Sequence, residues 1–231
     1  MQQEAASFGK RPSSHEQDHP QRRGREPQGQ PPCDLIVIGA SAGGIEALLT
    51  LAGGLPAALP ACLLIVQHLS PSKPSKLPTL LSRAGPLPAR WAVSQMEIEP
   101  GTISVAPPDQ HLLVRGRHLL VETGPREQRS RPSINVLFRS AAHGYGSRVV
   151  GVLLSGLNAD GAEGLLSIQQ QGGVTIVQDP RDAAFPEMPR SALTVLTSDY
   201  ILPVASIAPV LIQLATSALA NRSRAGEGTS L

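Results

Sequence analysis

The sequence predicts an α/β fold with a doubly wound, mostly parallel sheet, helices on both faces of that sheet and a small antiparallel hairpin section. Two observations predict it. Short apolar runs alternate with segments of helical periodicity, and the runs are apolar throughout, which is typical of parallel strands buried on both faces. The chain has 231 residues, 41% of them hydrophobic and 16% charged, and this suits a single globular domain.

The elements follow one another in order from Asp34. The first strand, helix and strand are "LIVIG", "GGIEALLTLAGGL" and "CLLIVQ", and a helix in "KLPTLLSRA" comes next. We interpret "TISVAPP" and "HLLVRGRHLLVET" as strands of the antiparallel section, the latter folding back at Gly116. Alternation resumes with "SINVLFRSAAHGYG", "RVVGVLLSG", "AEGLLSIQQQG" and "VTIVQD". A strand in "DYILP" and a helix in "SIAPVLIQLATSALA" complete the fold.

The two ends of the chain differ from the middle in composition. Residues 1–32 are rich in Gln, Arg, Pro, Ser and Gly, and we expect a disordered polar tail because such a segment cannot bury enough apolar surface to offset its ordering entropy. We expect residues 34–220 to form the folded domain and residues 221–231 a flexible tail. The HExxH pattern at His15–His19 lies in the first tail and precedes Pro20, so we interpret it as a chance match and not as a zinc site.

The composition also argues against several classes of function. A formal net charge of +2 and an aromatic content of 3% leave little to attract or stack nucleic acid. No apolar run approaches the roughly 18 residues that a membrane span needs, and a signal-peptide core is missing, so we expect a cytoplasmic protein without membrane insertion. Cys33 and Cys62 lack metal-site spacing, and we expect neither a metal nor a cofactor.

The turn "GASAGG" after the first strand is the first candidate functional feature. It fits a phosphate-binding loop at a helix N-terminus, although the middle glycine of a dinucleotide fingerprint is missing and Gln67 and His68 stand where an acidic residue would bind a ribose hydroxyl. It also fits G-x-S-x-G, in which the turn presents Ser41 as a nucleophile. A third interpretation makes Ser41 a helix N-cap only. The turn alone does not choose among the three.

His68 favours the nucleophile interpretation. It follows the second apolar strand, and the carboxyl ends of parallel strands meet at one edge of the sheet, where ligands bind. Ser41 and His68 are therefore expected within hydrogen-bond reach. A third group, a carboxylate that orients the histidine, has two candidates at further strand ends, Asp160 and Asp179. Asp160 also fits a capping box with Glu163, and Asp179 also fits a turn residue, so spacing leaves the choice open.

Two further segments are candidates for the rim of the crevice. Arg131 precedes Ser133, a predicted N-cap of the next helix, and it either meets an acidic protein partner or simply solvates the surface. The proline-rich "FPEMPR" follows another strand and contains Met188 and Arg190. Loops at this edge carry function, so Met188, Arg190 and Arg131 are candidates for shaping substrate access.

Together these motifs resemble the catalytic domain of the CheB-type protein-glutamate methylesterases. The resemblance covers Asp34 to about Ala220 and rests on "IGASAGG", "IVQHLSP", "APPDQHLLV", "RPSINVLFRSAA", "GVLLSGLNADGAEG" and "FPEMPRSAL", in the order that the family has them. Well-known members carry an N-terminal receiver domain, whereas about 33 tail-like residues come first here. The chain is therefore similar to a stand-alone form of the domain.

The resemblance implies a serine hydrolase that removes methyl esters from glutamate side chains on the cytoplasmic helices of chemoreceptors, and in many members also deamidates glutamines there. It implies that Ser41 is the nucleophile, His68 the general base and then acid, and Asp160 the orienting carboxylate. Candidates for the oxyanion hole are backbone amides at Ala42, Leu157 and Asn158. Other chemosensory signalling proteins are implied as partners. The alternatives are a catalytically weak regulatory or binding module and, less favoured, a nucleotide-binding α/β protein.

Overall fold

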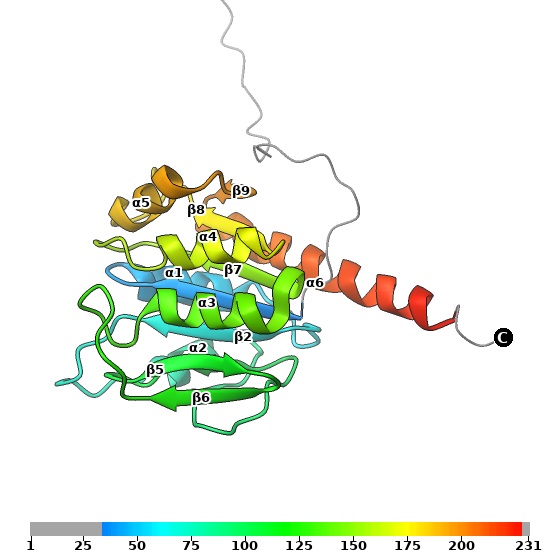
Figure 1. The fold of residues 1–231 in the computed structure, drawn as a ribbon, viewed down its shortest axis with the longest axis horizontal. Helices are drawn as coiled ribbons and strands as arrows, with labels where there is room; N and C mark the ends of the chain where they lie inside the picture. Colours follow the sequence, from blue (N-terminus) through cyan, green and yellow to red (C-terminus); the bar gives the residue numbers. More distant parts are fainter. Residues whose placement is uncertain (1–33, 228–231) are drawn as a thin grey trace, which may run out of the picture.

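The computed structural model describes residues 34–227 (Figure 1), and the predicted N-terminal tail, the HExxH pattern and residues 228–231 lie outside the described residues. The centre is a seven-stranded sheet in the order β3-β4-β2-β1-β7-β8-β9, in which all neighbouring strands pair in parallel. Its strands are β1 (Leu35–Ala40), β2 (Cys62–Gln67), β3 (Ala89–Trp91), β4 (Ile103–Val105), β7 (Val149–Leu153), β8 (Val174–Gln178) and β9 (Tyr200–Leu202).

Helices cover both faces of this sheet, which confirms the predicted fold class. One face is packed by α1 (Gly44–Gly53), α2 (Leu77–Ala84) and α6 (Val204–Glu227). The opposite face is packed by α3 (Ile134–Tyr145), α4 (Ala162–Gln170) and α5 (Glu187–Val195), together with the hairpin of β5 (His111–Arg115) and β6 (His118–Glu122). A short 3-10 turn, Gly146–Arg148, joins α3 to β7.

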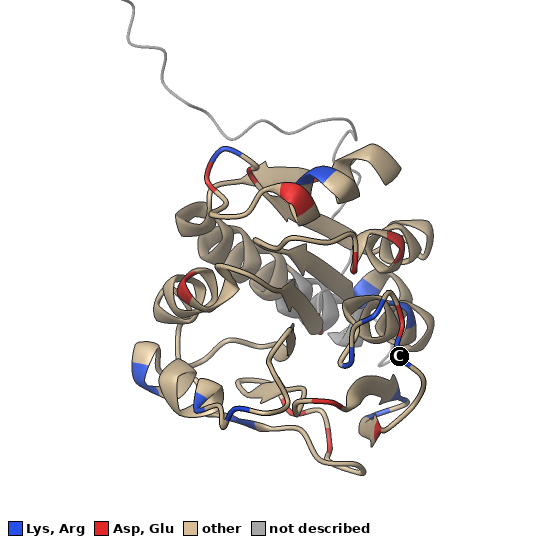
Figure 2. Ribbon diagram, turned by 90° about the vertical axis from the view of Figure 1, so that its left-hand side faces the viewer, with Lys and Arg blue, Asp and Glu red and all other residues tan. Residues whose placement is uncertain are grey.

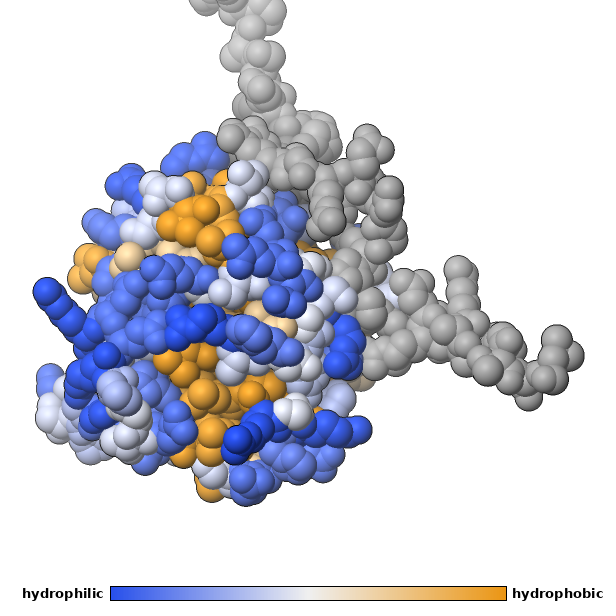
Figure 3. Space-filling model, viewed as in Figure 1, coloured by the Kyte–Doolittle hydropathy of each residue, from blue (hydrophilic) through white to orange (hydrophobic). Residues whose placement is uncertain are grey.

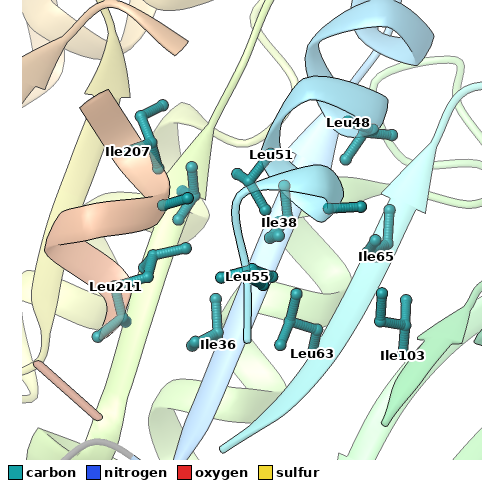
Figure 4. Close-up of a cluster of buried hydrophobic side chains, with 14 of the residues drawn as sticks. Ile36, Ile38, Leu48, Leu51, Leu55, Leu63, Ile65, Ile103, Ile207 and Leu211 are labelled. Atoms are coloured by element: carbon teal, nitrogen blue, oxygen red, sulfur yellow. The ribbon is translucent and has the colours of Figure 1, made fainter. Parts of the chain in front are cut away.

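The strands supply apolar side chains to both layers because successive residues of a strand point to opposite faces. On β1, Ile36 and Ile38 join the layer with α1 and α6, and Leu35 and Val37 join the layer with α3. Figure 4 shows the first layer, where leucines of α1 and residues of α6 meet the isoleucines of β1 and β2. Burial on both faces explains why these strands read as continuous apolar runs.

The strand order places a topological switch point beside β1. The connection from β1 to β2 passes through α1 on one face, and the connection that enters β7 on the other side of β1 passes through α3 on the opposite face. The loops after β1 and β7 therefore lead to opposite faces, and in open parallel sheets this is where ligands bind, in the crevice expected at the carboxyl ends of the strands. This edge lies on the left of Figure 1.

Two short strands differ from the prediction. The segment "TISVAPP" was expected in the antiparallel section, but its strand β4 pairs in parallel with β2, with Ile103 opposite Leu63. The hairpin β5–β6, which turns at Gly116 with φ 59°, is antiparallel as predicted. Strand β3 was not predicted at all. Strands of three residues are too short to show a period, so their placement depends on the tertiary contacts around them.

The last helix also differs from the prediction. A flexible tail was expected from residue 221, but α6 continues to Glu227, since the final "ANRSRAGE" contains mostly residues that a helix accommodates well. Along residues 34–227, no helix is long and apolar enough to cross a bilayer.

Candidate active site

The register of β1 and β2 places Ser41 next to His68. Ala40 and Gln67 are opposite each other in the last pair of this parallel ladder, so the next residues along each strand leave the sheet side by side. The ladder is extended by a hydrogen bond from the His68 N–H to the Ala40 carbonyl, at 3.0 Å. On the other side of β1, the Ser41 N–H donates to the carbonyl of Ser155, just beyond β7, at 2.9 Å. Ser41 is thereby held between two neighbouring strands.

A continuous chain of hydrogen bonds joins Ser41, His68 and Asp160. The Oγ of Ser41 lies 3.1 Å from Nδ1 of His68, and Nε2 of the same ring lies 2.9 Å from Oδ2 of Asp160. The His68 side chain is 16% exposed and the Asp160 side chain 0%. A hydroxyl bonded to one ring nitrogen and a buried carboxylate bonded to the other is the arrangement in which an imidazole can take a proton from the hydroxyl.

The carboxylate of Asp160 is held by the N-terminus of α3. Its Oδ1 accepts hydrogen bonds from the Ser133 hydroxyl at 2.8 Å and the Asn135 N–H at 3.0 Å, and its Oδ2 accepts the Ile134 N–H at 2.8 Å. Burial alone would raise the pKa of Asp160, but hydrogen bonds from His68 and from these N–H groups outweigh it, and the pKa lies below its ordinary value. Asp160 is therefore an anion in the neutral pH range.

This geometry separates the two functions that the sequence left open for Asp160. A capping box would place it at the start of α4, but the N-cap of α4 is Gly161, and the N–H groups of Gly161 and Gly164 donate to the Asn135 side chain. Asp160 instead caps α3. Ser133 occupies the predicted N-cap position of α3, but its hydroxyl bonds Asp160 and makes no cap hydrogen bond.

Asp179, the other candidate, is held elsewhere. Its carboxylate accepts hydrogen bonds from the backbone and guanidinium of Arg181, and these bonds lower its pKa more than partial burial raises it. This is the turn role that the sequence offered as the alternative. Asp160 and not Asp179 contacts His68 in the structure.

The turn after Ser41 has an unusual backbone. Gly43, not Ser41, is the N-cap of α1, and it has φ 68° in the left-handed region, where glycine is favoured. Within residues 34–227, the N–H of Ser41 and of Gly44 are taken by backbone carbonyls, and no hydrogen bond engages the N–H of Ala42. The N–H groups of Leu157 and Asn158 are likewise without a partner in that part of the chain. All three are therefore free to donate a hydrogen bond.

The rim of the crevice is partly apolar. Leu157, after β7, is 57% exposed and Phe185, after β8, is 38% exposed, and Figure 3 shows a small apolar patch on a left-hand edge that is otherwise mostly hydrophilic. Figure 2 looks onto the same edge and shows Lys and Arg mostly around its outline.

The three rim candidates have different surroundings. Met188 is fully buried within the layer of α3, α4 and α5. It lies close to where a Cβ on Gly156 would be, so it supports the loop after β7. Arg131 is paired with Asp109, since its guanidinium donates to both carboxylate oxygens of that residue. Arg190 is exposed on α5, which already begins within the segment expected as a loop.

Sequence reasoning missed the residues that support the catalytic candidates. Ser155 accepts the Phe185 N–H and donates to the Ala42 carbonyl, and thus joins the loop after β8 to the nucleophile turn. Gln67 bonds the backbone of both Ser41 and His68. Position at a strand end was the only available signal for both, because a serine or glutamine there shows nothing of its partner in the sequence.

No group of three or more His, Cys, Asp or Glu side chains within residues 34–227 is arranged to hold a metal ion. His111 is buried, accepts the Ser133 N–H and bonds the Pro125 carbonyl. It thereby anchors the segment that leads into α3.

Comparisons with known proteins identify the family. The CheB methylesterase family model matches residues 36–211. A protein of Leptospira interrogans is 38% identical over 190 residues, which are 82% of this chain and 98% of that protein. Protein-glutamate methylesterase FrzG of Myxococcus xanthus is 37% identical over 196 residues, 84% of this chain and 58% of FrzG. Protein-glutamate methylesterase/protein-glutamine glutaminase 2 of Methanosarcina mazei is 37% identical over 191 residues, 78% of this chain and 52% of that protein.

The fold gives the same answer as the sequence comparison. The crystal structure of the Thermotoga maritima CheB methylesterase catalytic domain matches with a TM-score of 0.75 and 29% sequence identity, covering 79% of this chain and 98% of that domain. The chain spans nearly all of that domain and of the Leptospira relative, and about half of the Methanosarcina protein. The chain therefore belongs to the CheB methylesterase family, whose members are carboxylic ester hydrolases.

Proposed function

We propose that residues 34–220 form a serine hydrolase that removes methyl esters from glutamate side chains on the cytoplasmic helices of chemoreceptors. The observation that carries the proposal is the hydrogen-bonded chain from Ser41 through His68 to the buried carboxylate of Asp160. The names of the relatives support the substrate, since those from Myxococcus and Methanosarcina are protein-glutamate methylesterases. A methylated receptor in the cytoplasm and other proteins of a chemosensory pathway are the partners that this activity requires.

The first half of the reaction forms an acyl-enzyme. Ser41 Oγ attacks the ester carbonyl carbon while its proton passes to Nδ1 of His68, and the carbonyl oxygen becomes an oxyanion. The tetrahedral intermediate then collapses, its bond to the methoxy oxygen breaks, and His68 returns the proton to that oxygen. Methanol leaves, and the glutamyl group stays on Ser41.

The second half repeats these steps with water. His68 takes a proton from the water as its oxygen attacks the acyl carbon, and it returns a proton to Ser41 Oγ when the ester bond breaks. The products are the glutamate carboxylate and the free enzyme. Asp160 accepts the Nε2–H of His68 throughout, so it keeps Nδ1 free to act as the base and stabilises the imidazolium in both halves.

The oxyanion requires hydrogen-bond donors that are already in place. The Ala42 N–H lies next to the nucleophile, and those of Leu157 and Asn158 belong to the loop that leads to Asp160; none is engaged within residues 34–227. We assign these amides as the candidate oxyanion hole. The apolar rim of Leu157 and Phe185 suits the methyl ester and the apolar neighbours of a glutamate on a receptor helix.

Deamidation of glutamine is a second activity of the same site. It is favoured by the name of the Methanosarcina relative, which includes protein-glutamine glutaminase. The chemistry differs only in the leaving group, since His68 would protonate the amide nitrogen and release ammonia. Ammonia release from unmodified receptor preparations tests this activity separately.

Methanol release from methylated receptor membranes tests the main proposal. Wild type should release methanol, and Ser41→Ala and His68→Ala should each lower the rate at least about 10³-fold. Asp160→Asn should lower it about 10³- to 10⁴-fold because the wrong tautomer is held, while the matched variant Asp179→Asn should stay within twofold of wild type. A wild-type protein that releases no methanol from several receptor preparations would contradict the proposal and favour a non-catalytic module.

A further inference from the structure

Gln67 is a buried side chain that contacts both ends of the Ser41–His68 pair. It is the last residue of β2 and is 3% exposed. Its Nε2 donates one hydrogen bond to the backbone carbonyl of Ser41 at 2.8 Å and another to that of His68 at 3.1 Å. A single amide thus bridges the backbones of two residues from different strands, at the point where both have left the sheet.

The orientation of this amide follows from its partners. Both contacts are carbonyl oxygens, which only accept, so the NH₂ group must face them and the Oε1 oxygen must face away. Among residues 34–227, Oε1 is buried without a hydrogen-bond partner. It lies against the first turn of α1, where a Cβ on Gly44 would be 2.6 Å away, and only glycine leaves room for it.

A buried amide whose NH₂ group has hydrogen-bond partners and whose oxygen has none is costly for the fold. A buried acceptor without a partner costs roughly 1–3 kcal/mol, and native proteins contain few such groups. An apolar side chain of the same length at this position would avoid that cost. The arrangement therefore costs stability, and what it provides is a fixed position for the backbones of Ser41 and His68.

We propose that Gln67 is a positioning residue for the catalytic pair, an inference that rests on the proposed function. Ladder hydrogen bonds fix Ala40 and Gln67, but the carbonyls of Ser41 and His68 lie beyond the ladder. The Gln67 bridge holds these two backbones at the separation that gives the 3.1 Å contact between Oγ and Nδ1. Small shifts in such a contact slow a reaction strongly without changing how substrate binds.

The experiment replaces Gln67 with methionine, which has a similar length and no donor. Two rates are measured on the full chain: methanol release from methylated receptor membranes, and labelling of Ser41 by a fluorophosphonate probe, which needs the reactive hydroxyl but no receptor. Gln67→Met should lower kcat and the labelling rate by about tenfold to a hundredfold, with the half-saturating receptor concentration within twofold.

Thr175→Val is the matched control. Thr175 is fully buried in β8, and its hydroxyl bonds Asp199 at 2.8 Å, so the variant also loses a buried hydrogen bond but at a distance from the pair. It should lower the melting temperature and leave both rates within twofold. Rates of Gln67→Met within twofold of wild type would overturn the proposal, and so would an equal slowing in Thr175→Val.

A second variant is used in case Gln67→Met does not fold. Gln67→Glu keeps the shape of the side chain and replaces the donor by an oxygen, so its loss of rate should be at least as large as that of methionine. If neither variant folds, Gln67 serves the fold as a whole and the proposal is overturned. A wild type that is labelled at Ser41 but releases no methanol would contradict the proposed substrate, and the labelling rates alone would then decide the role of Gln67.

Discussion

The carboxylate of Asp160 accepts the backbone N–H of Ile134, the first residue of α3, at 2.8 Å. The same carboxylate accepts hydrogen bonds from Ser133 and Asn135, so three donors come from the start of one helix. His68 supplies the fourth donor. The positive end of the α3 dipole adds to the stabilisation of the anion. The carboxylate is therefore fixed by a helix of one layer, whereas the imidazole that it contacts comes from the end of a strand of the central sheet.

This set of donors predicts how the stability contributed by Asp160 depends on pH. Because the folded pKa lies below the ordinary value of 3.8, the ionised carboxylate stabilises the fold fully above about pH 4, and this stability is lost as pH falls through the folded pKa. The part of the difference in unfolding free energy between wild type and Asp160→Asn that comes from the Asp160 carboxyl itself should thus be constant from pH 7 to 5. Below pH 4 it should shrink by at most about 1.4 kcal/mol per pH unit.

Urea denaturation of both proteins at a series of pH values measures this difference. Asp109 and Asp179 also have lowered pKa values, but Asp160 is not among the causes, so these groups cancel in the comparison. Arg139 is the main cause of the lowered pKa of Glu127, which the charge of Asp160 raises slightly, so Glu127 cancels only in part. A difference that grows on acidification would mean that the folded carboxyl binds its proton more tightly than the unfolded one, contrary to the prediction.

Ser133→Ala should reduce both stability and rate. The hydroxyl of Ser133 is fully buried and donates to Asp160 Oδ1 at 2.8 Å, and its loss should cost about 1.5–3 kcal/mol because the acceptor is charged. The remaining donors keep the carboxylate ionised, so kcat for methanol release should fall only about tenfold. Ser167→Ala is the control, since that hydroxyl only bonds the Glu163 carbonyl within α4. A Ser133→Ala enzyme that works at the full rate would show that the Ser133 hydroxyl is not needed to position the carboxylate of Asp160.

The sequence predicted the fold well where periodicity is long. The strands β1, β2, β7 and β8 and the helices α1 to α4 were placed correctly, since each carries its own period, whereas α5 begins within a segment that was expected as a loop. The three-residue strands β3 and β4 carry none, and β4 was assigned to the wrong section. Strand β4 pairs with β2, and β3 pairs with β4; a sequence pattern does not contain these contacts.

The residues of the candidate site likewise fall into those that the sequence could predict and those that it could not. Ser41 and His68 could be brought together from the sequence because parallel register fixes neighbouring strand ends. The choice of Asp160 over Asp179 came from the family resemblance alone, because Asp160 reaches His68 from a loop whose path depends on α3. Gln67, Ser133 and Ser155 act through hydrogen bonds to residues far along the chain, and no local motif marks them.

Cys62 should be inert in the native protein. Burial raises the pKa of its thiol to about 11 from 9.0, so near pH 8 the thiolate fraction is roughly a hundredfold below that of an ordinary cysteine. In a Cys33→Ser variant, iodoacetamide should therefore leave the native protein unmodified and alkylate one cysteine after unfolding in urea, as read by intact mass. Rapid alkylation without denaturant would contradict this prediction and show that the N-terminal end of β2 opens in the native protein.

Gly43→Ala should damage both fold and activity, and Gly116→Ala is its matched control. Both glycines have a left-handed φ, 68° and 59°, so each substitution carries a backbone cost of about 1–2 kcal/mol. A Cβ on Gly116 meets nothing within 4 Å, whereas one on Gly43 lies 2.9 Å from the Ser155 hydroxyl and 2.8 Å from Ala184 Cβ. The clash adds about 1–3 kcal/mol and displaces the turn that carries Ser41.

Thermal melts and fluorophosphonate labelling of the two variants separate these effects. Gly116→Ala should lose stability through its backbone alone and label at the wild-type rate, since the hairpin turn lies outside the crevice. Gly43→Ala should lose more stability and label at least about tenfold more slowly. Equal labelling rates in the two variants would show that the turn tolerates a side chain at Gly43, and that the close approach of Ser155 does not set the position of Ser41.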